Sequence, residues 1–148
     1  MPTSDVRDPL THGERLLIRA VRLLALGGCA GLPGHFDAAC GLHGAETYRM
    51  LTAFVQQLSL AGRRRVRLSP PRAPALSADE AAILDVFGAA QADDYRTLDE
   101  RLTALAGGPP PASLGAAACW VAQAFALNGL SLRTSFDAAA TPVLYAAE

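Results

Sequence analysis

The sequence predicts an all-α fold of about five helices packed around a central alanine-rich helix, and three observations predict it. Apolar residues recur at helical spacing over most of the chain. Residues that start and stop helices bracket these stretches. The third observation is Ala112–Leu132, a long stretch without a single charged residue in a chain of 148 residues. We expect one domain over residues 1–148, with poorly ordered tails at 1–9 and 137–148.

Two helical stretches are clear in the N-terminal half. Thr11 followed by Glu14 makes a capping box, which predicts a helix over about His12–Leu26. A second helix is predicted over Ala45–Ala61, where Gly62 ends the apolar pattern. Both helices carry a broad apolar arc that must be buried against other elements.

Three arginines of the first helix fall on a narrow stripe opposite its apolar arc. They are Arg15, Arg19 and Arg22, at spacings of four and three residues. A stripe of this kind predicts a face exposed to solvent. The alternative is a face that contacts an anion.

A second capping box is the best local signal in the chain. Ser77 and Glu80 stand at the two positions of the box and predict a helix that extends to about residue 92. An aspartate at position 93 or 94 then caps a further helix, which ends at Gly107. Because the connection is very short, these two helices are expected to form an antiparallel hairpin.

The alanine-rich stretch Ala112–Leu132 contains the only tryptophan, Trp120. We expect a buried helix up to about Asn128, because Gly129 is suited to a left-handed position after a helix end. A membrane-spanning helix is the alternative for an uncharged run of this length. The small residues and the amides of Gln123 and Asn128 favour a helix inside a protein core instead.

A minor two-stranded ribbon is also predicted. Arg63–Ser69 is extended in character, since Val66 is β-branched and two prolines follow the segment. Leu130–Phe136 alternates apolar and polar residues and is its predicted partner.

Charge is distributed unevenly although the net charge is only −1. Residues 1–72 hold ten arginines against five acidic residues, and residues 73–148 hold three arginines against nine. We expect the basic half to pair with the acidic half of the same chain or of a second copy. Three cysteines and a charged N-terminal region without a secretory pattern predict a cytoplasmic protein without a disulfide framework.

Two cysteines and two histidines occur in a glycine-containing connector that also predicts a short turn of helix at Phe36–Cys40. Thiolate and imidazole are the ligands that zinc prefers, so Cys29, His35, Cys40 and His43 form a candidate zinc site. The same loop is a candidate for a reactive thiol, because arginines lie nearby in the sequence. The alternative is that the cysteines are small buried apolar residues and no cofactor is bound.

Four arginines, Arg63, Arg64, Arg65 and Arg67, form a basic cluster that could contact phosphate groups. No recognisable motif or set of stacking aromatic residues accompanies them. A charged, solvated segment is therefore the alternative to a nucleic-acid site.

The sequence contains no pattern that assigns catalysis. No serine stands in a G-x-S-x-G turn and no H-E-x-x-H motif occurs. The leading prediction is a non-enzymatic interaction or structural protein that self-associates through its basic and acidic halves. The alternatives are a zinc- or thiol-dependent module and a nucleic-acid binder.

The order of these segments resembles small alphaproteobacterial proteins that are classed together as a domain of unknown function. An arginine-bearing helix, a second helix, RRRVRLSPP, LSADEAAILDVFGAAQADD and an alanine-rich helix ending in GLSL carry the resemblance. It spans about residues 14–132 and rests mainly on Arg63–Asp94. Cysteines often follow the proline pair in that family, whereas Arg72 and Ala73 stand there in this chain. The resemblance implies a helical fold and no particular activity.

Overall fold

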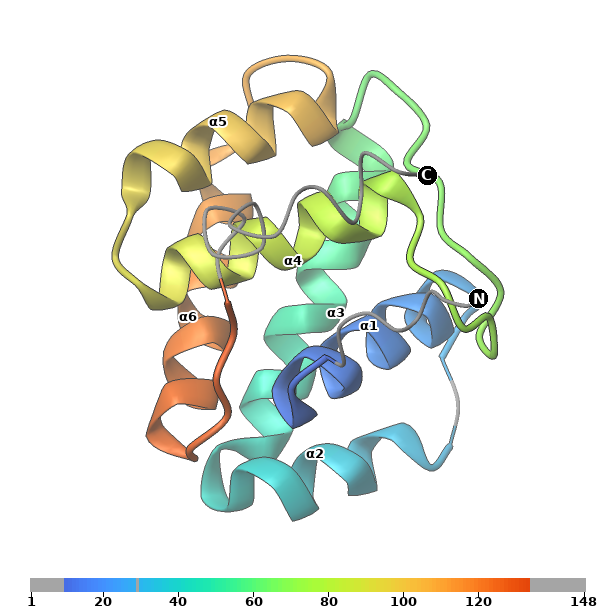
Figure 1. The fold of residues 1–148 in the computed structure, drawn as a ribbon, viewed down its shortest axis with the longest axis vertical. Helices are drawn as coiled ribbons and strands as arrows, with labels where there is room; N and C mark the ends of the chain where they lie inside the picture. The colour runs from blue at the N-terminus through green and yellow to red at the C-terminus, as the bar shows by residue number, and fades with distance from the viewer. Residues whose placement is uncertain (1–9, 29, 134–148) are drawn as a thin grey trace.

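The computed structural model describes residues 10–28 and 30–133, and all regular structure in this part of the chain is helical. The predicted all-α class is therefore confirmed. The predicted tails at 1–9 and 137–148 lie outside the described residues. In chain order the elements are α1 (His12–Ala25), α2 (Leu32–Cys40), the 3₁₀ turn η2 (Gly41–His43), α3 (Gly44–Ala61), α4 (Ala78–Gln91), α5 (Tyr95–Ala106) and α6 (Ala112–Leu127) (Figure 1).

The inner face of α6 supplies the centre of the core. It packs against α3 and α4, while α4 and α5 form the predicted antiparallel hairpin and α2 packs on α3 (Figure 1). Val121 and Phe125 are fully buried, and Leu98, Leu102 and Leu105 of α5 are buried with them. The prediction of a central alanine-rich helix is thus confirmed. No helix within the described ranges is long and apolar enough to cross a membrane.

The helix ends are set by local signals. Both predicted capping boxes are present, at Thr11 and Glu14 for α1 and at Ser77 and Glu80 for α4. Asp94 caps α5 through a hydrogen bond from the backbone N–H of Thr97 at 3.2 Å. Each of these side chains satisfies a backbone donor that the first turn of a helix leaves without an intrahelical partner.

Helix α2 is longer than the short turn expected at Phe36–Cys40, because it begins at Leu32. Pro33 stands in its first turn, where the missing N–H of proline breaks no hydrogen bond. Phe36 is fully buried, and its ring lies 5.7 Å from that of Tyr48 and 6.5 Å from that of Phe125. These ring contacts hold α2 against the core.

The predicted two-stranded ribbon is wrong for the part of it that the structure describes, residues 63–69 and 130–133, where no strand occurs. Arg63 N and Leu130 N donate to backbone carbonyls of α5 and α6, and other backbone N–H groups of these segments bind side chains. Arg67 N donates to Asp79, Ser69 N to Glu80, and Leu132 N to Gln91. Polar side chains on helices thus take the place of a partner strand. Residues 134–136 of the expected second strand lie outside the described residues.

Candidate interaction site

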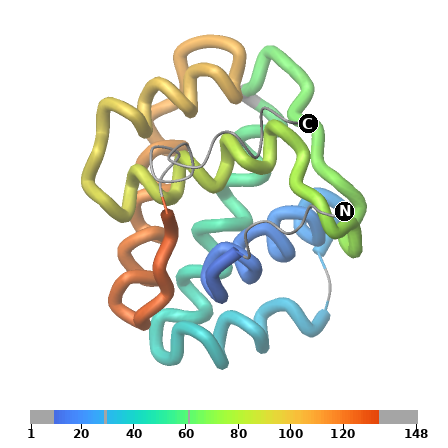
Figure 2. The backbone as a smooth tube through the Cα atoms, in the orientation of Figure 1, coloured from blue at the N-terminus to red at the C-terminus, as the bar shows by residue number. Residues whose placement is uncertain are grey.

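Residues 62–77, here called the linker segment, connect α3 to α4 without helix or strand (Figure 2). At its start Arg63 N donates to the carbonyl of Ala106 at 2.6 Å. Farther along, the carboxylates of Asp79 and Glu80 in the first turn of α4 bind its backbone. Since each of these contacts comes from a helix, the linker segment is fixed on the body of the molecule along its length.

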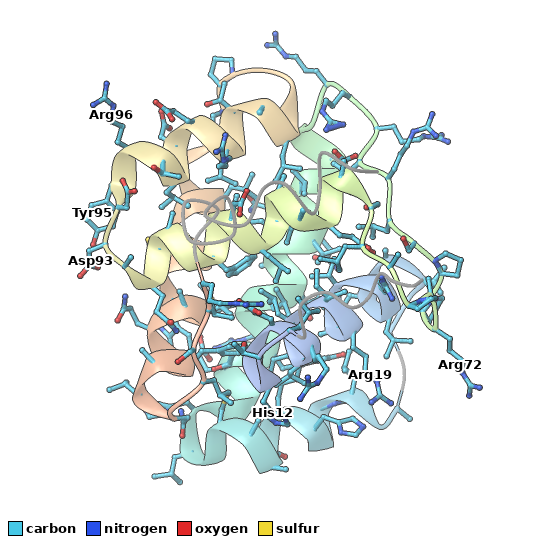
Figure 3. The ribbon with its side chains drawn as sticks, in the orientation of Figure 1. His12, Arg19, Arg72, Asp93, Tyr95 and Arg96 are labelled. Carbon is cyan, nitrogen blue, oxygen red and sulfur yellow. The ribbon has the colours of Figure 1, made fainter. Side chains whose placement is uncertain are left out.

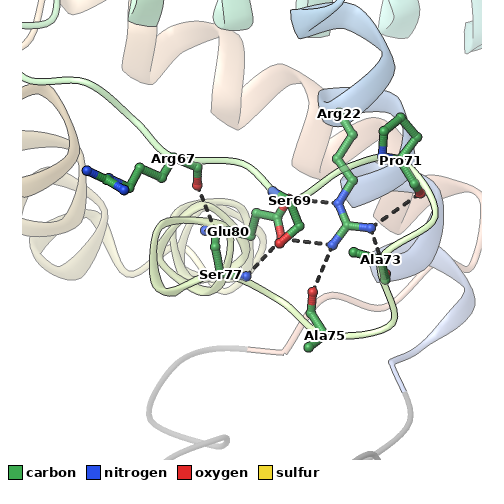
Figure 4. Close-up of polar contacts among 8 residues, drawn as sticks. All are labelled: Arg22, Arg67, Ser69, Pro71, Ala73, Ala75, Ser77 and Glu80. Atoms are coloured by element: carbon green, nitrogen blue, oxygen red, sulfur yellow. Dashed lines mark hydrogen bonds and ion pairs between the residues drawn. The ribbon is translucent and has the colours of Figure 1, made fainter.

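The carboxylate of Glu80 is the main anchor of the linker segment (Figure 4). Nε of Arg22 donates to Oε2 at 2.7 Å, and Nη2 donates to Oε1 at 2.8 Å. The backbone N–H groups of Ser69 and Ser77 donate to the same carboxylate, each at 2.9 Å. Glu80 is 0% exposed, so every acceptor it offers is used inside the protein.

The guanidinium of Arg22 uses its remaining donors on the backbone of the linker segment (Figure 4). Its side chain is only 6% exposed. The prediction of a solvated stripe is therefore wrong for Arg22, although Arg15 and Arg19 are exposed as expected. Burial is tolerated because the charge is paired with Glu80 and hydrogen-bonded on all sides. The carbonyl acceptors are those of Pro71, Ala73 and Ala75, at 3.4, 3.0 and 3.1 Å.

These contacts determine the pKa of Glu80. Burial by itself disfavours the charged form and would raise the pKa. The hydrogen bonds from Arg22, Ser77 and Ser69, together with the charge of Arg22, outweigh that effect and lower the pKa below its ordinary value. Glu80 is therefore ionised at neutral pH and acts as a structural anion.

The ion pairs show how the uneven charge distribution is used. The Arg22–Glu80 and Arg64–Asp79 pairs each join the basic half of the chain to the acidic half. A third long-range pair, Arg133–Glu14, runs in the opposite direction, with the acid in the first half. The predicted pairing of the two halves thus occurs within one chain.

Three of the four arginines predicted as a nucleic-acid site are exposed and have no acidic partner among the described residues: Arg63, Arg65 and Arg67. The fourth, Arg64, binds Asp79 and the carbonyl of Ala104. Arg72 is also exposed on the linker segment and points away from the body (Figure 3). The structure brings these side chains to one segment, and nucleic-acid binding there stays a prediction.

The predicted zinc ligands are not gathered into a site in the part of the chain that the structure describes. His35 and His43 are exposed, whereas Cys40 is fully buried in the core. No group of three or more His, Cys, Asp or Glu side chains within residues 10–28 and 30–133 is placed to hold a metal ion. Cys29 lies outside the described residues, so the four-ligand site stays a prediction.

Burial raises the pKa of the Cys40 thiol more than the hydrogen bond with Thr47 lowers it. Because the thiolate is the reactive form, a thiol with a raised pKa is a poor nucleophile at neutral pH. Cys40 therefore behaves as a small apolar core residue, which is the alternative that the sequence left open.

Sequence reasoning missed the outward face of α6, the side of that helix that its neighbours leave exposed or half-exposed. At its edges Ser113 donates to Gln57 of α3 and Gln123 donates to the carbonyl of Ala90 in α4. No residue of α6 is charged, which is unusual for a helix face in contact with water. The signal was the uncharged run itself, which we assigned entirely to the core. The outward face of α6 comprises the exposed residues Ala112, Ser113, Ala116, Gln123, Ala126 and Leu127 and the half-buried residues Gly115, Cys119 and Trp120.

Large apolar side chains extend this face at both sides. Leu127 is 73% exposed, and Leu42 of η2 is fully exposed beside the same helix end, where the side chains of Asn128 and His43 approach within 3.4 Å. On the α5 side, Tyr95 and Cys119 line a shallow groove of about 270 Å³. The hydroxyl of Tyr95 donates to Asp93 at 2.9 Å, which orients the ring at this edge (Figure 3).

Comparisons with known proteins do not identify the chain. No family model, no curated protein and no solved structure matches it. The resemblance to an alphaproteobacterial family of unknown function therefore stays a prediction.

Proposed function

We propose that this chain is a non-enzymatic, cytoplasmic interaction protein that associates with a second copy of itself through the outward face of α6. One observation carries the proposal: a helix that supplies the centre of the core also presents an uncharged face to solvent. The chain has 13 basic and 14 acidic residues, and none of them stands on α6. An exposed surface of small uncharged residues, with the large apolar side chain of Leu127 at its end, is suited to a contact with another protein.

The distribution of side-chain size along the face favours an antiparallel pair of α6 helices. The first half of this face carries small residues, Ala112, Gly115 and Ala116. The second half carries the larger side chains of Gln123 and Leu127. In an antiparallel pair each Leu127 lies opposite Ala112 of the other copy, so large residues meet small ones at both ends. Such a contact is isologous, because both copies use the same surface.

The size of this surface predicts a weak dimer. A helix of 16 residues is about 24 Å long. A strip of that length and about 10 Å wide covers about 240 Å², well below the roughly 800 Å² per partner of a standard stable interface. We therefore expect a concentration-dependent equilibrium between monomer and dimer.

This mode of association differs in one measurable way from pairing through basic and acidic halves. Charge pairing weakens as salt is added, because ions screen exposed charges. An apolar interface is unaffected or strengthened by salt. Arg22–Glu80 and Arg64–Asp79 already join the two halves within one chain, which favours the apolar mode.

Sedimentation equilibrium at low and high salt tests the proposal. Ala116→Arg places a charge in the middle of the outward face and should abolish association at both salt concentrations. Ala38→Arg makes the same change at an exposed position of α2 and is the matched control. A wild-type monomer at all concentrations, or equal loss in both variants, would contradict the proposal.

Crosslinking gives a second test of the geometry. The midpoint of α6 lies between Cys119 and Trp120, so an antiparallel pair brings the two Cys119 thiols near the two-fold axis. A short bis-maleimide should link two copies of a Cys29→Ser variant, and the link should disappear in Cys29→Ser/Cys119→Ser. The buried Cys40 is not expected to react, since it is 0% exposed.

A further inference from the structure

A second surface, independent of α6, lies where the linker segment passes over the end of α1 and the side of α3. The groove between them has a volume of about 340 Å³. This is within the range of pockets that bind small molecules, at its lower end. The groove is partly open to solvent, and residues of the linker segment form part of its lining.

The interior of this groove is aliphatic. Val55 and Leu58 of α3 form one side, and Val66 and Leu68 of the linker segment form the other. Phe54 contributes to the floor but is only 1% exposed, so no aromatic face is available for stacking a base. The lining therefore suits an aliphatic chain better than a nucleotide.

The rim of the groove is basic. Arg65 lines it, is exposed, and has no acidic partner among the described residues. Arg64 lines it as well but is held by Asp79 and by the carbonyl of Ala104. Arg65 is thus the guanidinium available to a ligand, and a carboxylate or phosphate is the group that a guanidinium binds best.

The part of the linker segment that carries Arg65 is already held in place before any ligand binds. Residues on either side of it are fixed to α4, by the contacts of Arg64 with Asp79 and of Ser69 with Glu80. The buried Arg22 side chain holds the later part of the linker segment by donating to the carbonyls of Ala73 and Ala75. A site of this kind binds with little loss of chain entropy.

We propose that this groove binds an anionic amphiphile, with a medium-length aliphatic chain between Val55 and Leu68 and its anionic head group on Arg65. A volume of about 340 Å³ suits a chain of medium length. A purely polar anion such as inorganic phosphate would leave the aliphatic part of the lining without a partner. This inference does not depend on the dimer, because α6 contributes no residue to the groove.

Decanoate, kept below its micelle concentration, is the probe that tests the proposal. Titration calorimetry should show saturable binding of decanoate and none of butyrate, which has the head group without the chain. Decyltrimethylammonium, which has the chain with a positive head group, should not bind. No binding of decanoate at millimolar concentration, or equal binding of decanoate and decyltrimethylammonium, would overturn the proposal.

Two arginine variants locate the site. Arg65→Gln should weaken decanoate binding about tenfold, as expected for loss of one charge-assisted hydrogen bond. Arg72→Gln removes an exposed arginine of the same linker segment that does not line the groove, and should leave binding unchanged. Equal effects of the two substitutions would mean general attraction to a basic surface and would overturn the assignment.

A third experiment distinguishes binding of a free amphiphile from binding to a lipid membrane. Phosphatidylcholine vesicles containing phosphatidylglycerol present the same chemistry in a membrane. Binding to these vesicles without binding to monomeric decanoate would overturn the groove proposal in favour of a surface contact. Val55→Gln should reduce decanoate binding without weakening vesicle binding, and its circular dichroism spectrum checks that the variant is folded.

Discussion

Glu14 and Glu80 occupy the same position in their helices, the third residue after the N-cap, and each binds a distant arginine as well as its own cap. Glu80 binds Arg22, 58 residues away, and Glu14 binds Arg133, 119 residues away. Each carboxylate also accepts a backbone N–H from a remote segment, from Ser69 and Arg133 respectively. One local motif therefore starts a helix and closes a long-range contact at the same time.

The first prediction concerns the buried charge of Arg22. Glu80→Gln should lower the free energy of unfolding by about 3–5 kcal/mol, because it leaves a buried guanidinium without its anion. Urea unfolding followed by circular dichroism measures the loss. Glu46→Gln removes the partner of Arg49 in an exposed pair and should cost less than about 1 kcal/mol. Similar losses in both variants would contradict this account of Glu80.

The second prediction is a dependence of stability on pH. Burial raises the pKa of both Glu14 and Glu80, but their hydrogen bonds and arginine partners outweigh it and leave both values lowered. The stability that each contributes is complete above the ordinary glutamate pKa of about 4.3 and is lost as pH falls through the lowered value.

The change in unfolding free energy between pH 6 and pH 3 checks this sign, since these limits bracket the ordinary glutamate pKa of about 4.3. The Glu14→Gln/Glu80→Gln variant should be less stable at pH 6 and should depend less on pH. A variant with the full wild-type slope would show that other groups control acid unfolding.

The third prediction concerns the segment after α6, which turns back alongside that helix (Figure 2). Nε2 of Gln91 donates to the carbonyls of Ala122 and Leu130 at 3.1 and 2.9 Å, and Oε1 accepts from Leu132 N at 2.8 Å. Gln91→Ala should destabilise the protein by about 2 kcal/mol, because it leaves buried backbone groups without partners. Amide hydrogen exchange at Leu132 should accelerate. Gln56→Ala, at an exposed position of α3, is the control and should change neither quantity.

The fourth prediction compares two glycines that have no neighbouring atom within 4 Å of an added Cβ, Gly34 and Gly129. Gly34 lies in α2, so Gly34→Ala should stabilise the protein by about 0.5–1 kcal/mol through helix propensity. Gly129 has a φ of +74°, so Gly129→Ala should destabilise it by about 1 kcal/mol. Thermal unfolding of both variants checks the opposite signs. Shifts in the same direction would mean that space, rather than backbone conformation, decides the outcome.

Local features of this fold could be predicted from the sequence, and long-range ones could not. The boxes at Thr11 and Ser77 and the glycine that follows α6 depend on residues within one helical turn. Nothing in the neighbourhood of Arg22 indicates that it is buried, because its partner Glu80 comes from another helix. Its helical spacing with Arg15 and Arg19 instead suggested an exposed stripe.

The error over the ribbon has the same origin. The absence of helix over residues 63–69 agrees with the prediction, since it depends on local residues and the following prolines. The partner of an extended segment is a matter of tertiary structure. Here the acceptors are the side chains of Asp79 and Glu80, which a pattern of alternating residues does not distinguish from a second strand.

The candidate surfaces show the same limit. The uncharged run that forms α6 was visible in the sequence, but its division into a buried and an exposed side depends on which helices cover it. Likewise, the arginines at 63–67 form a visible cluster in the sequence. Only the structure separates Arg64, which is paired with Asp79, from Arg65, which stands at the rim of an aliphatic groove.

The contact of Arg22 with the linker segment has a consequence for sequence drift. Its guanidinium binds main-chain oxygens of residues 71, 73 and 75, and most side chains in that stretch are exposed. These hydrogen bonds are thus made by the main chain and do not depend on the side chains of the residues that supply them. Substitutions at the exposed positions other than the prolines can alter the chemistry displayed on that side of the protein while these contacts persist.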